Sequence, residues 1–314
     1  MRNLKEQPVR TLFLGTDWES VETLKALDID KRFEIVGVIT AVDKEMGRKQ
    51  VLTPSKVKEY AVKNNIEVYH TQKQKERYEK VLDIFKPELI VCKAFGEILP
   101  GFFIQYPKYK AINIHFSILP KYRGAVPIQK AILEGEKETG ISIMLMSDGM
   151  DEGDILKIFK EPILLDDTNL SLRKRLVKKS AEVLGDILED WVNGKITPVV
   201  QDSSKATYCW QKDISKENAQ ILWDSMEPKY IERLVRAMLP WPVAWCMLDG
   251  KRVKLFDVEI VDRDIFKKPG EISYDNSEIL FGTKDDGVFV KVNELQIEGK
   301  NKMSYTQFLN GMKS

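Results

Sequence analysis

From the N-terminus to about residue 200, short apolar runs alternate with stretches that have the period of an amphipathic helix. Parallel strands need long crossover connections, so this alternation is typical of a parallel sheet flanked by helices. We therefore predict a Rossmann-like α/β domain. Its strands are expected at 11–14, 33–40, 68–70, 89–92, 111–115, 141–146 and 155–159, and its helices at 21–27, from 54, at 81–85, 127–134 and 172–191.

The pattern changes after residue 194. Residues 201–205 are polar and predict a linker, and short β-rich runs follow at 243–248, 253–260, 278–281 and 287–292. Asp249-Gly250 between the first two runs is a strong hairpin signal. We predict a catalytic domain at 1–194, a linker at 195–207 and a small β-barrel resembling an OB fold at 208–314, with a helix near 231–238.

Composition narrows the class of protein. No apolar run approaches the roughly 20 residues needed to cross a bilayer, and the first residues lack the apolar core of a signal peptide. Three widely spaced cysteines and two histidines argue against a disulfide framework and a metal site. The net charge of +1 gives no global basic field, so any nucleic-acid contact must be local. We expect a cytoplasmic, monomeric enzyme without membrane contact.

Two polar side chains on the strand near residue 113 are the first candidates for chemistry. Side chains two apart on a strand point to the same face, so Asn113 and His115 project together while Ile112 and Ile114 point the other way. An amide supplies hydrogen-bond donors, and an imidazole moves protons near neutral pH. If Asp151 folds back beside them, the three could stabilise and reprotonate a tetrahedral oxyanion. His70 is expected to be structural.

Three ordered segments resemble the folate-dependent formyltransferases. They are the sequences Ala-Phe-Gly-Glu-Ile-Leu-Pro at 94–100, Asn-Ile-His-Phe-Ser-Ile-Leu-Pro-Lys-Tyr-Arg-Gly-Ala-Val-Pro-Ile-Gln at 113–129, and Met-Ser-Asp-Gly-Met-Asp-Glu-Gly-Asp at 146–154. The resemblance continues at 205–208, 221–223 and 240–242, and so covers nearly the whole chain. It implies a formyltransferase-type α/β domain, a barrel resembling an OB fold, and transfer of the formyl group of 10-formyltetrahydrofolate to an amine.

The resemblance also assigns residues. It selects Asn113, His115 and Asp151 as catalytic, with Asn113 and protonated His115 donating to the oxyanion and Asp151 raising the pKa of His115. Asp151 could also hold a water that relays a proton. The loops expected to hold the pterin comprise Phe95, Gly96, Glu97, Ile98 and Leu99, then Ser117, Ile118, Leu119 and Pro120, with the loop before Asp151.

The acceptor amine is less closely defined. A basic loop after the second strand contacts tRNA in family members that formylate initiator methionyl-tRNA, and Arg48 and Lys49 match its start, although the loop is short here. An alternative acceptor is a nucleotide-linked amino sugar. A third possibility is that the protein is a catalytically silent folate- or RNA-binding module, but the intact triad argues against this.

Glu97 and Phe116 depart from the family pattern. Gly15-Thr16 lacks a full G-x-G-x-x-G and predicts only a tight strand-to-helix turn.

Overall fold

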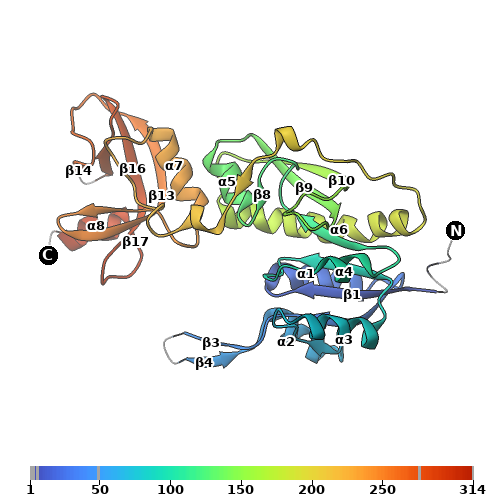
Figure 1. Cartoon of the computed structure of the whole chain (residues 1–314). Helices are drawn as coiled ribbons and strands as arrows, with labels where there is room; N and C mark the ends of the chain where they lie inside the picture. Colours follow the sequence, from blue (N-terminus) through green and yellow to red (C-terminus); the bar gives the residue numbers. More distant parts are fainter. Residues whose placement is uncertain (1–3, 5–6, 48–49, 275–276, 313–314) are drawn as a thin grey trace. The chain divides into compact units, whose positions relative to one another are not determined.

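The computed structural model describes residues 4, 7–47, 50–274 and 277–312. The chain forms two compact units (Figure 1). The N-terminal unit comprises Met1–Arg123, Gly140–Glu161 and Lys174–Thr207, and the C-terminal unit comprises Gly124–Thr139, Pro162–Arg173 and Tyr208–Ser314. The domain limits at residues 194 and 208 stay a prediction.

A seven-stranded sheet in the order β10-β9-β7-β6-β1-β2-β5 carries the catalytic candidates. From β5 to β7 the neighbours are parallel, which confirms the Rossmann-like prediction. β9 pairs with β7 in the antiparallel direction, so the sheet is mixed at this edge rather than parallel throughout. The strands are β1 Val9–Gly15, β2 Phe33–Ile39, β5 Val68–Tyr69, β6 Leu89–Lys93, β7 Ala111–His115, β9 Glu138–Leu145 and β10 Ile155–Pro162.

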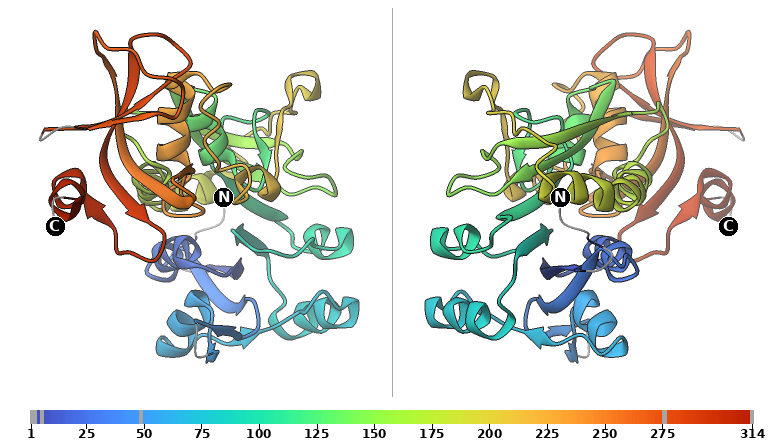
Figure 2. Two further views of the ribbon diagram at one scale, coloured as in Figure 1. Left: turned by 90° about the vertical axis from the view of Figure 1, so that its left-hand side faces the viewer. Right: turned by 90° about the vertical axis from the view of Figure 1, so that its right-hand side faces the viewer.

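Four helices flank the parallel strands. Figure 2 shows α1 (Trp18–Asp28) and α2 (Lys56–Lys63) on one face, and α3 (Lys75–Phe85) and α4 (Gly101–Gln105) on the other. Right-handed crossovers require this division, because the strand order reverses direction between β1 and β6. In such a sheet, ligands bind beyond the carboxyl ends of the strands, where β6 and β7 terminate.

Close packing explains two glycines in this unit. A Cβ on Gly15 would lie 2.5 Å from the Cβ of Ser20, which confirms the tight turn from β1 into α1. A Cβ on Gly37 would lie 2.4 Å from the ring of Phe85, so α3 packs directly on the backbone of β2. The apolar side chains of β1 and β6 are buried between the two helical layers, as expected for strands covered on both faces.

The polar stretch predicted as a loop after β2 contains a hairpin. β3 (Lys44–Met46) pairs with β4 (Val51–Thr53) in antiparallel register. Three-residue strands with mixed polar side chains leave almost no period-two signal, which explains the wrong prediction. Arg48 and Lys49, the predicted tRNA contacts, lie outside the described residues.

The long helix α6 (Asn169–Val192) has the predicted apolar stripe, with Leu172, Leu176, Leu184 and Leu188 buried.

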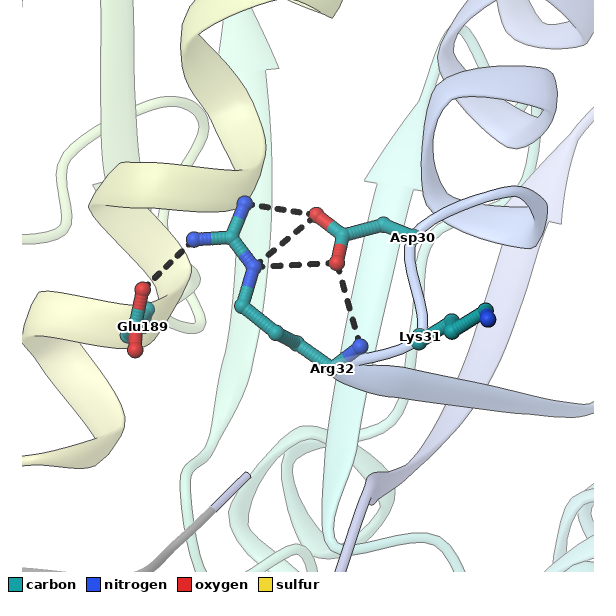
Figure 3. Close-up of a pocket in the computed structure, with 4 residues that line it drawn as sticks. All are labelled: Asp30, Lys31, Arg32 and Glu189. Carbon is teal, nitrogen blue, oxygen red and sulfur yellow. Dashed lines mark hydrogen bonds and ion pairs between the residues drawn. The ribbon is translucent and has the colours of Figure 1, made fainter. Parts of the chain in front are cut away.

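A hollow of about 570 Å³ lies beside the C-terminal part of α6 and is lined by Asp30, Lys31, Arg32 and Glu189 (Figure 3). The guanidinium bonds Asp30 at 2.6–3.0 Å and Glu189 at 2.5 Å. Burial by itself raises the pKa of Asp30, but its bonds with Arg32 outweigh burial and lower that pKa. These ion pairs connect the start of β2 to α6, so we interpret Arg32 as a structural residue.

The C-terminal unit is built on an antiparallel sheet, which confirms the predicted barrel-type domain. The Asp249-Gly250 hairpin joins β12 to β13, with Leu248 opposite Lys251. Trp223 stacks on Phe281, with ring centroids 5.0 Å apart. The elements are β8 Arg123–Gly124, α5 Pro127–Leu133, β11 Tyr208–Cys209, α7 Pro228–Ala237, β12 Trp245–Leu248, β13 Lys251–Asp262, β14 Ile272–Tyr274, β15 Ile279–Gly282, β16 Val288–Ile297, β17 Met303–Ser304 and α8 Tyr305–Met312. Among residues 4, 7–47, 50–274 and 277–312, no helix is both long and apolar enough to cross a membrane.

Candidate active site

Strand β7 presents the two predicted polar side chains on one face. Ile112 and Ile114 are buried, as the alternation along a strand requires. Asn113 and His115 both reach the Asp151 side chain, which belongs to the loop between β9 and β10. The prediction that these two side chains project together is therefore confirmed.

Asp151 meets each partner with a different oxygen. Asn113 Nδ2 donates to Asp151 Oδ1 at 3.3 Å, and His115 Nδ1 lies 3.5 Å from Asp151 Oδ2. The His115 side chain is 6% exposed and that of Asp151 is 16% exposed. Three side chains that are distant in sequence thus form one cluster at the carboxyl end of β7. Because Asn113 has a second amide hydrogen, it can donate to Asp151 and to a developing oxyanion together.

The backbone of the 149–154 loop is specialised to present Asp151. Asp151 has a φ of 52°, a left-handed conformation that Asp tolerates better than most residues. A Cβ on Gly153 would lie 1.8 Å from the carbonyl oxygen of Leu145, so only glycine fits there. The N–H of Leu145 also donates to the carbonyl oxygen of Asp154 in this turn, at 2.9 Å. The turn is therefore fixed against the end of β9.

His115 is held from both sides of its ring. Nε2 lies 2.8 Å from the carbonyl oxygen of Tyr122. A carbonyl oxygen only accepts, so Nε2 carries the hydrogen, and in the neutral ring Nδ1 presents a lone pair toward Asp151. The backbone thus selects the tautomer whose free nitrogen faces the carboxylate.

The surroundings of His115 favour a different resting protonation from the predicted one. Burial lowers its pKa below the ordinary value; the charge of Asp151 and the bond to Tyr122 act in the opposite, predicted direction but do not outweigh burial. The charge of Lys93 also lowers this pKa. His115 is therefore neutral at pH 7. In this state its Nδ1 is free to accept a proton.

Two residues at the end of β6 adjoin the cluster. Cys92 is fully buried, and burial together with the charge of Asp151 raises its thiol pKa to about 12, so it is not a nucleophile at neutral pH. The Lys93 ammonium donates to the carbonyl oxygen of Ile114 at 3.2 Å and lies 3.1 Å from the ring centroid of Phe116. Glu19 lies 3.8 Å from the same ammonium. Phe116, which departs from the family pattern, therefore covers a buried cation.

The first loop predicted to bind the pterin follows β6. Phe95 is half-buried against the core, Leu99 is buried, and Gly96 and Ile98 are exposed. A Cβ on Gly101 would lie 2.7 Å from Asp148 Oδ1, which places this loop beside the loop that carries Asp151. The exposed side chain of Ile98 and the exposed backbone of Gly96 are features that a flat heteroaromatic ligand requires.

Glu97 anchors that loop to the protein. Its Oε2 accepts from the Thr71 hydroxyl at 2.7 Å, the Lys73 N–H at 3.0 Å and the Tyr78 hydroxyl at 2.6 Å. Burial and the bond to Glu97 raise the pKa of Tyr78, so the phenol keeps its proton and remains a donor. The side chain of Glu97 therefore points into a structural anchor, while its backbone stays in the predicted pterin loop.

The second predicted pterin loop comprises residues 117–120. Ser117 and Leu119 have buried side chains, whereas Ile118 and Pro120 are half-buried. The Ser142 hydroxyl donates to the carbonyl oxygen of Ser117 at 2.7 Å and accepts from the N–H of Leu119 at 3.2 Å. This segment offers a fixed wall with two half-buried side chains.

Sequence reasoning missed the residues that hold the catalytic cluster in place. Tyr122 acts through a backbone carbonyl, which no side-chain pattern reveals. Gln201, predicted as part of a polar linker, is 7% exposed and bonded to the Asp151 loop. Its polarity resembles that of its exposed neighbours, so only the structure separates it from them. Across the part of the chain that the structure describes, no group of three or more His, Cys, Asp or Glu side chains is arranged to hold a metal ion.

The chain belongs to the formyl transferase family. The family model of the formyl transferase domain matches residues 9–188, and the model of the formyl transferase C-terminal domain matches residues 213–313. The chain is 37% identical over 303 residues to the methionyl-tRNA formyltransferase of Pediococcus pentosaceus, covering 96% of this chain and 93% of that protein. It is 40% identical over 306 residues to that of Caldicellulosiruptor saccharolyticus, covering 96% of each.

Solved structures share the fold at lower identity. HypX from Aquifex aeolicus in complex with tetrahydrofolic acid superposes with a TM-score of 0.66 at 19% identity, covering 96% of this chain and 47% of that chain. WlaRD, a sugar 3N-formyltransferase solved with dTDP and 5-N-formyl-THF, gives a TM-score of 0.65 at 21% identity, covering 93% and 99%. At these identities the likeness concerns the fold alone.

Proposed function

We propose that this protein transfers the formyl group of 10-formyltetrahydrofolate to the amino group of methionyl-initiator tRNA. One observation carries the proposal: methionyl-tRNA formyltransferases are 37–40% identical to nearly the whole chain, including the segments that bring Asn113, His115 and Asp151 together. Sugar formyltransferases such as WlaRD resemble it only at 21% identity. The amino-sugar alternative therefore has weaker support.

The geometry supports a division of work among the three side chains. 10-Formyltetrahydrofolate supplies the carbonyl carbon that the amine attacks. Asn113 donates to the oxygen as it becomes negative, an interaction typically worth about 3–4 kcal/mol in the transition state. The attacking nitrogen must lose a proton, and His115 Nδ1 with Asp151 Oδ2 forms an acceptor pair for it. The same pair then returns the proton to the leaving nitrogen.

We assign pterin binding to residues 95–99, 117–120 and the loop before Asp151. Open backbone near Gly96 and the half-buried rings and chains of Phe95, Ile118 and Pro120 suit a planar ligand. Glu97 contributes by anchoring its own loop, through three donors on one carboxylate oxygen.

We place the tRNA contact at Arg48 and Lys49, which follow Met46 and Gly47 in the family order. Charged side chains at this position would bind phosphate by releasing counterions. We further propose that the enzyme is a cytoplasmic monomer, for which size-exclusion chromatography of the purified chain is the test.

The acceptor is tested by incubating the protein with 10-formyltetrahydrofolate and either methionyl-initiator tRNA or a dTDP-linked amino sugar. We expect formylmethionine on the tRNA and no formylated sugar. His115→Ala serves as the control for contaminating activity, and its turnover should fall by at least about 10²-fold. Formylation of the sugar alone would replace the proposal with the amino-sugar alternative.

A further inference from the structure

The segment 199–207 lies between the two regions that match the family, which end at residue 188 and begin at residue 213. Its polar composition predicts a linker, but within the N-terminal unit it is bonded along its length. Val199 exchanges two backbone hydrogen bonds with Ile155, at 2.8 and 2.9 Å. Thr207 receives the N–H of Tyr122 on its hydroxyl at 2.9 Å and the N–H of Arg123 on its carbonyl at 2.8 Å. We call residues 199–207 the strap.

Gln201 is the residue of the strap that reaches the catalytic loop. Its Nε2 donates to the carbonyl oxygen of Asp151 at 2.8 Å and to that of Gly153 at 2.7 Å. The two carbonyls flank Glu152, so one side-chain amide holds the backbone on both sides of Glu152 in the turn that presents Asp151. Because this turn includes a left-handed residue, it needs such external support.

Arg123 holds Gln201 from the other side. The Arg123 guanidinium donates to Gln201 Oε1 through Nε at 3.1 Å and Nη2 at 2.9 Å. The Arg123 side chain is 1% exposed, and Glu152 lies 3.4 Å from its Nη1. A buried cation on the amide oxygen polarises the amide and strengthens its two donated bonds. The orientation of Gln201 is also settled, because its oxygen must face the guanidinium.

The strap reaches the other half of the catalytic pair as well. Tyr122, whose N–H bonds Thr207, offers its carbonyl to His115 Nε2 at 2.8 Å. Thr207 and Gln201 are six residues apart in the strap and contact the loops that orient His115 and Asp151, respectively.

We propose that Gln201 is a positioning residue, which with Arg123 sets the separation of His115 and Asp151 by holding the carbonyls of Asp151 and Gly153. This inference rests on the proposed formyl transfer and assigns a role in it to a residue outside both matched regions. Gln201 touches no reacting atom. It acts through the backbone of the loop that carries Asp151.

The test compares Gln201→Met and Gln201→Glu with the wild-type protein. Methionine has similar length and no amide. Glutamate keeps an acceptor for Arg123 but cannot donate to the two carbonyls, so it guards against misfolding caused by loss of the acceptor that Gln201 Oε1 supplies. Gln105→Met, at an exposed position of the same unit, is the matched control. We expect both Gln201 variants to lose about 10–100-fold in kcat, the size of effect that a misplacement near 1 Å produces, with little change in the KM for folate.

A second readout separates positioning from a general loss of folded enzyme. The chain has two histidines, so NMR titration resolves His115 with His70 as an internal reference. We expect the His115 titration midpoint to move in both Gln201 variants, while His70 and the control variant stay as in the wild type. Lower kcat with an unmoved His115 midpoint, or unchanged kcat, would overturn the proposal. If the wild-type protein formylates no tRNA, the proposed function fails, but the titration still tests the role of Gln201.

Discussion

Asp151→Asn tests whether His115 and Asp151 act as a pair. Asparagine matches aspartate in shape and tolerates the left-handed backbone found at this position, so the turn should persist. Asn113 Nδ2 can still donate to the side-chain oxygen of the new residue. The substitution therefore removes one charge and leaves the packing nearly unchanged.

The structure sets the scale of the effect. Two unit charges 3.5 Å apart attract by about 5 kcal/mol at an effective dielectric constant of about 20. Partial exposure of Asp151 reduces this ceiling. In the wild type this attraction opposes burial, which is the larger influence and lowers the pKa of His115. Without the carboxylate, only the bond to the Tyr122 carbonyl opposes burial, and the pKa of His115 should fall further. The imidazole then accepts a proton from the amine less readily, and we expect kcat at pH 7 to fall about 10²–10³-fold.

The lowered pKa of His115 also makes the stability of the folded protein depend on pH. Because the pKa of His115 is lower in the folded state, the unfolded chain binds more protons below the ordinary value of about 6.5. His115 therefore costs no stability above that pH, and stability is lost as pH falls from there through the folded pKa. In Asp151→Asn this loss should extend to lower pH, because the folded pKa is lower still.

The assay combines single-turnover formylation with histidine NMR between pH 4 and 8, using Asp83→Asn as the control. Asp83 is an exposed aspartate on α3 with no assigned role in catalysis or binding, so its replacement should leave both readouts unchanged. A His115 pKa that stays constant or rises in Asp151→Asn, or a kcat within threefold of the wild type, would refute the coupling.

Four further predictions follow from the site and the fold. Asn113→Ala should lower kcat about 10²–10³-fold through loss of an oxyanion donor, as measured by single-turnover formylation. Glu97→Gln should raise the KM for folate about 3–10-fold with little effect on kcat, because the loop anchor weakens. Arg48→Ala should weaken tRNA binding and flatten its salt dependence; an unchanged slope would remove Arg48 from the interface. Arg32→Met should lower the free energy of unfolding by about 1–3 kcal/mol in urea titrations while activity persists.

Elements with long periodic signals could be predicted from the sequence. The buried strands β1 and β6 have continuous apolar runs, and the stripe of α6 from Leu172 to Leu188 extends over more than four turns. The hairpin at Asp249-Gly250 follows from turn chemistry. The direction of β9 could not be predicted, because an apolar run has the same pattern in parallel and antiparallel strands.

The catalytic cluster was predictable only in part, since its support is non-local. Asn113 and His115 share a strand, so their common face follows from alternation. The bonds that fix Asp151 span 48 to 50 residues to Gln201, and Arg123 reaches Gln201 across 78 residues. Hydrogen bonds of that range leave no periodic trace in the sequence. The influence of burial on the pKa of His115 could not be predicted for a related reason: a charged neighbour can be inferred from motif order, whereas burial depends on the whole fold.

The neutral state of His115 determines whether the pair it forms with Asp151 takes up or gives away a proton first. Tyr122 fixes the hydrogen on Nε2, so while His115 is neutral its Nδ1 lone pair and an oxygen of Asp151 face each other 3.5 Å apart with no proton between them. Two acceptors that face each other, one buried and one partly buried, repel, and a proton placed between them relieves that repulsion. An amine that attacks a carbonyl becomes acidic at the moment its bond forms. In the proposed reaction, the resting pair receives a proton at that step and then releases it to the leaving nitrogen. A His115 that is already protonated at rest has no free nitrogen to receive it.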